Sequence, residues 1–168
     1  MSLPFAAWVR RLAAPAPLRP PGARDERTFA ALCIRCDRCV EVCPYRTLRP
    51  AGWAYGPDAG TPLVVARETP CWLCMLCPPA CPTGALEVVR DGRAVRMGLA
   101  RVIVDRCYAH QGILCRTCAD ECPYQGEAIF MDAELKPRVT EKCVGCGICE
   151  HRCPADGSAI RVAPREAA

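Results

Sequence analysis

The chain has 168 residues, a formal net charge of +4, and 16 cysteines, 17 prolines and 12 glycines. Aromatic residues make up only 6% of it, which disfavours a large enzyme with a deep pocket for an organic substrate. Covalent or metal cross-links are expected to replace part of the core, and no apolar run approaches the ~20 residues that a transmembrane segment needs.

Residues 1–24 form the first predicted unit, an extended arm. Phe5, Trp8, Val9 and Leu12 lie at the spacing of one face of a short helix, and the segment 13–22 is rich in proline. Because so short an apolar stripe cannot bury itself, we expect the arm to dock on a partner subunit.

Arg10 and Arg11 look like the start of a twin-arginine export signal. The apolar stretch that follows is interrupted by Pro15 and Pro17 and ends at Arg19. A stretch this short and broken does not serve as the apolar region of a signal peptide. We therefore expect a cytoplasmic protein.

Residues 25–168 contain all the cysteines, after a predicted helix over 25–32 that Asp25 would cap. The cysteines fall into four groups, each ended by Cys-Pro: Cys33, Cys36, Cys39 and Cys43; Cys71, Cys74, Cys77 and Cys81; Cys107, Cys115, Cys118 and Cys122; and Cys143, Cys146, Cys149 and Cys153. Groups one, two and four follow C-x2-C-x2-C-x3-C-P. Group three is a stretched version, with seven residues between Cys107 and Cys115.

This spacing is the ligand pattern of bacterial [4Fe–4S] ferredoxins, in which three cysteines bind one cubane and the fourth binds its neighbour. Zinc sites instead pair two C-x2-C knuckles across a gap, and disulfides would require export. We therefore predict four [4Fe–4S] clusters with all 16 cysteines as ligands. His110, in the stretched part of group three, is then expected to be an exposed loop residue and not a ligand.

Short β-branched segments between the groups predict strands. They cover residues 83–89, 100–107, 126–131, 138–143 and 157–162, and Asp91-Gly92 is a predicted hairpin turn. The predicted fold class is α+β, with tandem or nested bacterial 2[4Fe–4S] ferredoxin-like domains built from short β-hairpins and helices.

The sequence leaves two ways to pair the four groups into domains. A hairpin at Asp91-Gly92 would join groups two and three directly, which favours nesting: one module over 71–122 and another from 33–43 plus 143–153. The nested ligand sets are Cys71, Cys74, Cys77 and Cys122; Cys107, Cys115, Cys118 and Cys81; Cys33, Cys36, Cys39 and Cys153; and Cys143, Cys146, Cys149 and Cys43. Tandem pairing would instead join group one to two and group three to four.

The clusters would reverse the apparent charge of the chain. Four oxidised clusters with their thiolates change the formal net charge of +4 to about −4. The arginines are spread through the cysteine loops and are not gathered with aromatic residues, so we predict no nucleic-acid binding.

The loops between the cysteines are expected to tune the reduction potentials. Arg35 and Arg38 in group one favour the reduced cluster, whereas the apolar loop 72–76 of group two disfavours it. Gly145 and Gly147 in group four would let backbone N–H groups approach sulfur.

Several segments resemble the MauM/NapG-type four-cluster polyferredoxins. They are Leu18-Arg-Pro-Pro-Gly-Ala23 followed by Phe29-Ala-Ala-Leu-Cys33, then Cys43-Pro44-Tyr45, and Gly60-Thr61-Pro62. The stretched step in group three is similar too, and the resemblance covers residues 18–162. It implies, for periplasmic members of this type, a role in passing quinol electrons toward a nitrate reductase system.

With a cytoplasmic location, a four-cluster chain of this size is similar to the small iron–sulfur subunit of bacterial tungsten aldehyde oxidoreductases. That resemblance implies a hetero-oligomer in which the chain relays electrons between a large tungsten- or molybdenum-cofactor subunit and a flavin subunit or other carrier. The sequence offers no nucleophile or acid–base pair of its own, so we expect the chain alone to be non-catalytic. The NapG-type role is the alternative.

Overall fold

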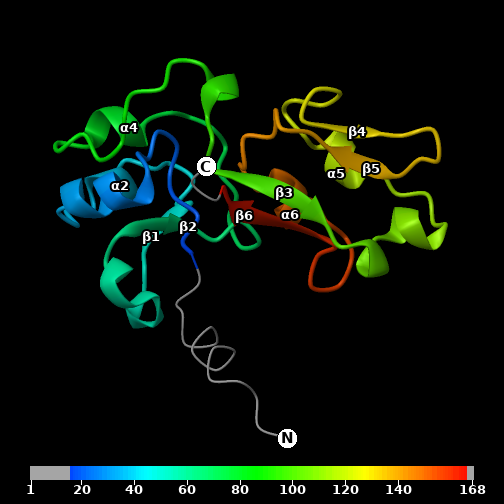
Figure 1. Ribbon diagram of the computed structural model, residues 1–168, viewed down its shortest axis with the longest axis horizontal. Helices are drawn as coiled ribbons and strands as arrows, with labels where there is room; N and C mark the ends of the chain where they lie inside the picture. Colours follow the sequence, from blue (N-terminus) through cyan, green and yellow to red (C-terminus); the bar gives the residue numbers. More distant parts are fainter. Residues whose placement is uncertain (1–15, 166–168) are drawn as a thin grey trace, which may run out of the picture.

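The cysteine groups are linked by short helices and two-stranded sheets in the computed structural model, which describes residues 16–165 (Figure 1). The helices are α2 (Glu26–Leu32), α3 (Arg38–Glu41), α4 (Cys77–Ala80), α5 (Thr117–Asp120) and α6 (Ile148–Arg152), and the strands are β1 (Leu48–Pro50), β2 (Pro62–Val64), β3 (Gly98–Val102), β4 (Ile129–Met131), β5 (Pro137–Val139) and β6 (Ile160–Pro164). Short 3-10 turns lie in the loops: η1 (Trp53–Asp58), η2 (Gly92–Ala94), η3 (Val104–Arg106) and η4 (Tyr108–Gln111). Among the described residues, every helix is too short or too polar to cross a membrane.

The same order of elements occurs twice along the chain. In the first half, group one leads through α3 into the antiparallel β1–β2 pair and then into group two and α4. In the second half, group three leads through α5 into the antiparallel β4–β5 pair and then into group four and α6. Figure 1 shows these halves side by side, and we call them the N-terminal domain (residues 17–95) and the C-terminal domain (residues 98–164).

The domains therefore follow the tandem arrangement, and the nested prediction was wrong. Nesting relied on a hairpin at Asp91-Gly92, but the Asp91 side chain accepts a hydrogen bond from the Arg93 N–H and the chain forms η2 there. Residues 83–89 form no strand and contribute only an isolated bridge from Leu86 to Ala23. The next strand, β3, pairs instead with β6 at the end of the C-terminal domain.

The other strand predictions were confirmed to within a few residues. The segments predicted over 100–107, 126–131, 138–143 and 157–162 overlap β3, β4, β5 and β6. The predicted helix over 25–32 is α2, and Asp25 caps it by accepting a hydrogen bond from the Thr28 N–H at 3.1 Å. The β1–β2 pair was not predicted, because its strands lie in a segment that looked like a linker.

The predicted arm of residues 1–24 ends earlier than expected. Residues 17–21 are buried in the N-terminal domain, and the Leu18 carbonyl accepts a hydrogen bond from the Val64 N–H of β2 at 2.8 Å. This segment therefore belongs to the domain. The apolar stripe predicted over Phe5 to Leu12 lies outside the described residues.

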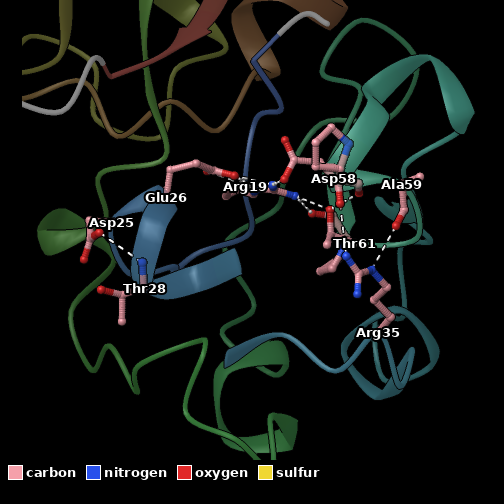
Figure 2. Close-up of polar contacts among 10 residues, drawn as sticks. Arg19, Asp25, Glu26, Thr28, Arg35, Asp58, Ala59 and Thr61 are labelled. Carbon is pink, nitrogen blue, oxygen red and sulfur yellow. Dashed lines mark hydrogen bonds and ion pairs between the residues drawn. The ribbon is translucent and has the colours of Figure 1, made fainter. Parts of the chain in front are cut away.

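Arg19 joins this segment to α2 and to the loop between β1 and β2 (Figure 2). Its guanidinium is ion-paired with Glu26 and with Asp58, donates to the Thr61 hydroxyl at 2.6 Å, and lies 4.5 Å from the centre of the Phe29 ring. Because Arg19 is only 5% exposed, these partners replace the water that the buried charge has lost.

Candidate cluster-binding sites

The structure brings the cysteines together in four cavities, each lined by four thiols. In each cavity, three cysteines come from one group and the fourth comes from the other group of the same domain. We name them the outer N-terminal set (Cys33, Cys36, Cys39, Cys81), the inner N-terminal set (Cys71, Cys74, Cys77, Cys43), the inner C-terminal set (Cys143, Cys146, Cys149, Cys122) and the outer C-terminal set (Cys107, Cys115, Cys118, Cys153).

These cavities suit the same kind of occupant. They are alike in size, and their walls are mainly apolar apart from sulfur. Each supplies four soft thiol donors around a space, which is the donor set that a [4Fe–4S] cube requires. Cluster binding to four thiolates in an apolar shell would supply one-electron redox chemistry here.

Three of the four cysteine loops share one backbone conformation. The second and fourth residues after the first cysteine have left-handed backbone angles: Arg35 and Asp37 in group one, Leu73 and Met75 in group two, Gly145 and Gly147 in group four. This repeated conformation wraps the loop so that three side chains from seven residues face one cavity. Non-glycine residues rarely adopt it, so groups one and two bear a local strain that the glycines of group four avoid.

Polar groups next to sulfur were not predicted from the sequence. The Thr83 hydroxyl lies 3.6 Å from the Cys81 sulfur, and the Ala159 N–H donates to the Cys153 sulfur at 3.2 Å. Thr117 lies 3.8 Å from the sulfur of Cys115 in the same way. In the sequence, the available signal was a threonine two residues after a cysteine. Polar contacts of this kind tune thiolate ligands.

Burial and crowding disfavour thiolates in the metal-free protein. Burial, and then the neighbouring thiols Cys33 and Cys36, raise the pKa of Cys39 to about 11. Burial, and then the other three thiols of its set, raise the pKa of Cys118 to about 12. Metal binding at these cavities must therefore release protons. The positive charge of iron offsets the repulsion between the neighbouring thiolates.

The outer N-terminal set lies closest to the surface. Cys36 is exposed, whereas the other 15 cysteines are buried or half-buried. Its neighbour Arg35 is among the residues that line this cavity, and it donates hydrogen bonds to the Ala59 carbonyl at 2.9 Å and the Pro57 carbonyl at 3.0 Å (Figure 2). Arg35 therefore ties the group-one loop to the β1–β2 loop as well as carrying charge near the site.

Two residues of the variable loops have clear positions. Trp72 lines the inner N-terminal cavity, and its ring centre lies 6.0 Å from that of Tyr45. His110, expected to be exposed, is half-buried in η4, and the residues that line the outer C-terminal cavity do not include it.

The two inner sets meet at the contact between the domains. The Cys71 N–H donates to the Cys146 carbonyl at 2.8 Å. The hydrophobic core beneath the N-terminal domain also continues into group four, through Val144, Cys146 and Ile148. The four sets therefore follow one another from the outer N-terminal set, through the two inner sets, to the outer C-terminal set.

Comparison with known proteins agrees with this division. The 4Fe-4S dicluster domain family matches residues 32–85, which contain groups one and two. The 4Fe-4S binding domain family matches residues 105–125 and 140–156, which contain groups three and four. With two such domains, the 16 cysteines fit four [4Fe–4S] clusters.

Whole-chain relatives extend across both domains. The chain is 44% identical to the methylamine utilization ferredoxin-type protein MauM of Methylorubrum extorquens, over 89% of this chain and 73% of the relative. It is 43% identical to the ferredoxin-type protein NapG of Escherichia coli, over 88% of this chain and 70% of the relative. A second MauM, from Methylobacillus flagellatus, is 44% identical over 95% of this chain and 74% of the relative. The chain therefore belongs to the MauM/NapG family of ferredoxin-type iron–sulfur proteins.

Proposed function

We propose that this chain relays electrons between a donor and an acceptor protein, with each of the four cysteine sets holding one [4Fe–4S] cluster. The observation that carries the proposal is the continuous row of four similar cysteine-lined cavities. The exposed Cys36 gives one end of the row a position from which electrons can be exchanged with another protein.

The chain's own residues have three tasks in such a relay. The cysteines hold the clusters, and the apolar walls keep water from them. The N–H and hydroxyl groups of Ala159, Thr83 and Thr117 tune the sulfur ligands. The chemistry that starts or ends with a substrate then belongs to partner proteins.

For the partners, we favour the NapG-type role, in which electrons from a quinol pass toward a nitrate reductase system. The similarity to NapG supports it, and the equal similarity to MauM supports a methylamine-linked relay as well. The tungsten aldehyde oxidoreductase partner expected from the sequence has no such support from the relatives, and we keep it only as the second candidate.

One experiment tests both levels of the proposal. The tagged full chain is purified without oxygen from its own cells, with the proteins that accompany it, and analysed for iron, sulfide, molybdenum and tungsten. We expect about 16 iron atoms per chain, an EPR signal on reduction with dithionite, and a nitrate-reducing or methylamine-oxidising partner system. Fewer than four clusters would contradict the relay.

The same preparation decides between the partner candidates and the compartments. A stoichiometric tungsten-containing partner with aldehyde oxidation would overturn the NapG-type proposal in favour of the second candidate. Fractionation of the cells tests the cytoplasmic location expected from the sequence, since recovery with periplasmic marker proteins would contradict it.

A further inference from the structure

The contact between the two domains is made directly by the loops that carry the inner cysteine sets. Next to the Cys71–Cys146 hydrogen bond, the Met97 N–H donates to the Val144 carbonyl at 3.1 Å. All residues from Val144 to Glu150 are buried. We call this contact, formed by residues 66–71, 97–98 and 144–147, the domain seam.

Gly147 leaves room for this approach. A Cβ atom on Gly147 would lie 2.4 Å from the Ala66 Cβ of the N-terminal domain. A Cβ atom on Gly145 would lie 2.2 Å from the Gly98 nitrogen, so Gly145 makes room for β3 of its own domain.

The left-handed backbone alone does not explain these glycines. At the matching positions, groups one and two carry Arg35, Asp37, Leu73 and Met75 in the same conformation. The cysteine loop therefore accepts side chains there, and the glycines of group four meet a different need. Gly147 permits contact with the other domain, and Gly145 permits contact with β3.

Arg67 adds a second connection across the domains. Its Nη1 atom lies 2.8 Å from the Glu150 carbonyl and 3.1 Å from the Cys153 carbonyl, at the C-terminal end of α6. The His151 ring nitrogen Nδ1 lies 3.0 Å from the Arg67 carbonyl in return. A cation at a helix C-terminus also interacts favourably with the helix dipole, so Arg67 fixes α6 to the N-terminal domain.

We propose that Gly147 and Arg67 are positioning residues that hold the two inner cysteine sets in contact through the Cys71–Cys146 peptide hydrogen bond, and so make one continuous electron path from two ferredoxin domains. The inference rests on the proposed function. One electron leaves the reduced inner site of one domain and enters the oxidised inner site of the other, and no bond is made and no proton is transferred.

The test compares two glycine-to-alanine variants of the full, cluster-loaded chain. Gly147→Ala adds a methyl group at the seam, where φ is +86° and the added Cβ would lie 2.4 Å from the Ala66 Cβ. Gly126→Ala is the matched control, because its φ is +79° and its Cβ would meet no atom within 4 Å. Both variants add the same backbone strain, and only the first adds a clash with the other domain.

Three measurements are made on each variant. Iron and sulfide content reports cluster loading, and we expect four clusters in both. Hydrogen exchange at the Cys71 amide reports the seam, and we expect it to speed up about fivefold or more in Gly147→Ala alone, as for the loss of one hydrogen bond. Rapid-freeze EPR after a substoichiometric pulse of dithionite follows the spread of electrons between the domains, which we expect to slow only in Gly147→Ala.

Arg67→Gln provides the second variant, because it removes the cation without adding bulk. We expect it to slow the spread of electrons between domains, with loading and midpoint potentials unchanged. If Gly147→Ala fails to load, Arg67→Gln alone decides the question. The proposal would be overturned if a cluster-loaded seam variant showed faster exchange at the Cys71 amide but redistributed electrons at the wild-type rate. It would also be overturned if Gly126→Ala slowed electron redistribution equally. A wild-type chain without four reducible clusters would instead contradict the proposed function.

Discussion

The N-terminal and C-terminal domains have the same order of elements, but different contacts join the ends of the chain segment to the rest of each domain. In the C-terminal domain, β3 and β6 form five consecutive antiparallel pairs, from Gly98 with Pro164 to Val102 with Ile160. The corresponding place in the N-terminal domain has only the isolated bridge between Ala23 and Leu86. There the buried Arg19 and its ion pairs take over part of the connection between the chain ends and the body of the domain.

This difference shows which parts of the repeat the cysteine sites require. Both domains keep the two short helices and the hairpin between their cysteine groups, and both supply a fourth cysteine across the domain. The contacts around the loops differ between the domains, because they only have to bury the side of each cysteine loop that faces away from its cavity. The two domains thus share the arrangement of their cysteine groups. The β3–β6 sheet in one domain and the Arg19 ion pairs in the other stabilise that arrangement in different ways.

The largest expected effect concerns the tandem pairing itself. Cys81→Ala removes the fourth thiol of the outer N-terminal set, although Cys81 lies in group two. We expect the loss of one cluster, or about a quarter of the iron. Alkylation under anaerobic conditions followed by mass spectrometry should then label Cys33, Cys36 and Cys39.

The nested arrangement makes a different prediction for the same variant. There, Cys81→Ala would expose Cys107, Cys115 and Cys118 to alkylation. Cys153→Ala is the matched control in the C-terminal domain, where the structure predicts the opposite labelling: Cys107, Cys115 and Cys118 become reactive and group one stays protected.

The sheet of the C-terminal domain can be weakened at its most buried strand residue. Ile160 is 2% exposed and packs with Ala100, Ala119 and Ile129. Ile160→Ala leaves a cavity, and we expect it to lower the free energy of unfolding by about 3 kcal/mol. Loss of cluster absorbance in an anaerobic guanidinium series measures the effect. Ile113→Ala is the control, because Ile113 is 54% exposed and its loss should change stability by less than about 0.5 kcal/mol.

The ion-pair network of the N-terminal domain should contribute somewhat less. Arg19→Met keeps much of the buried volume but leaves Asp58 and Glu26 without their cation. Since these carboxylates are 25% and 49% exposed and can be hydrated, we expect a loss of about 2 kcal/mol, below the usual range for a fully buried pair.

The control for Arg19 is the exposed pair of the other domain, Arg138 with Asp132 at 2.7 Å. Arg138→Met should cost less than about 1 kcal/mol in the same guanidinium series. If the two arginine variants lost equal stability, the N-terminal domain would not depend on Arg19 in place of a sheet.

Local signals made much of this comparison predictable from the sequence. The Asp25 cap of α2 and the strands β3 to β6 followed from residue type and spacing, as did the grouping of each set of three cysteines. The source of the fourth cysteine did not follow, because it depends on β3 pairing with a strand about 60 residues away. At Asp91-Gly92, a local turn signal pointed to a hairpin that this distant pairing displaced.

The glycines of group four show a second limit of the sequence. Gly145 and Gly147 could equally serve a left-handed backbone, an approach to sulfur or a close contact with another segment. The position of Gly98 and Ala66 in the folded chain reveals the close contact, which the sequence alone does not show.

The smallest expected effect concerns the charge beside the exposed end of the row. Arg35→Leu removes a cation next to Cys36, so we expect a lower midpoint potential for the outer N-terminal set. Arg35 is exposed, and an exposed charge contributes at most ~1 kcal/mol. That corresponds to no more than about 40 mV for a one-electron couple, which EPR-monitored titration can resolve.

Arg35→Lys separates charge from position: it keeps the cation but loses the paired hydrogen bonds to Pro57 and Ala59. A normal potential in Arg35→Lys with a lowered one in Arg35→Leu would assign the effect to charge. Equal shifts in both would assign it to the tie between the group-one loop and the β1–β2 loop, and no shift in either would remove Arg35 from the tuning of this site.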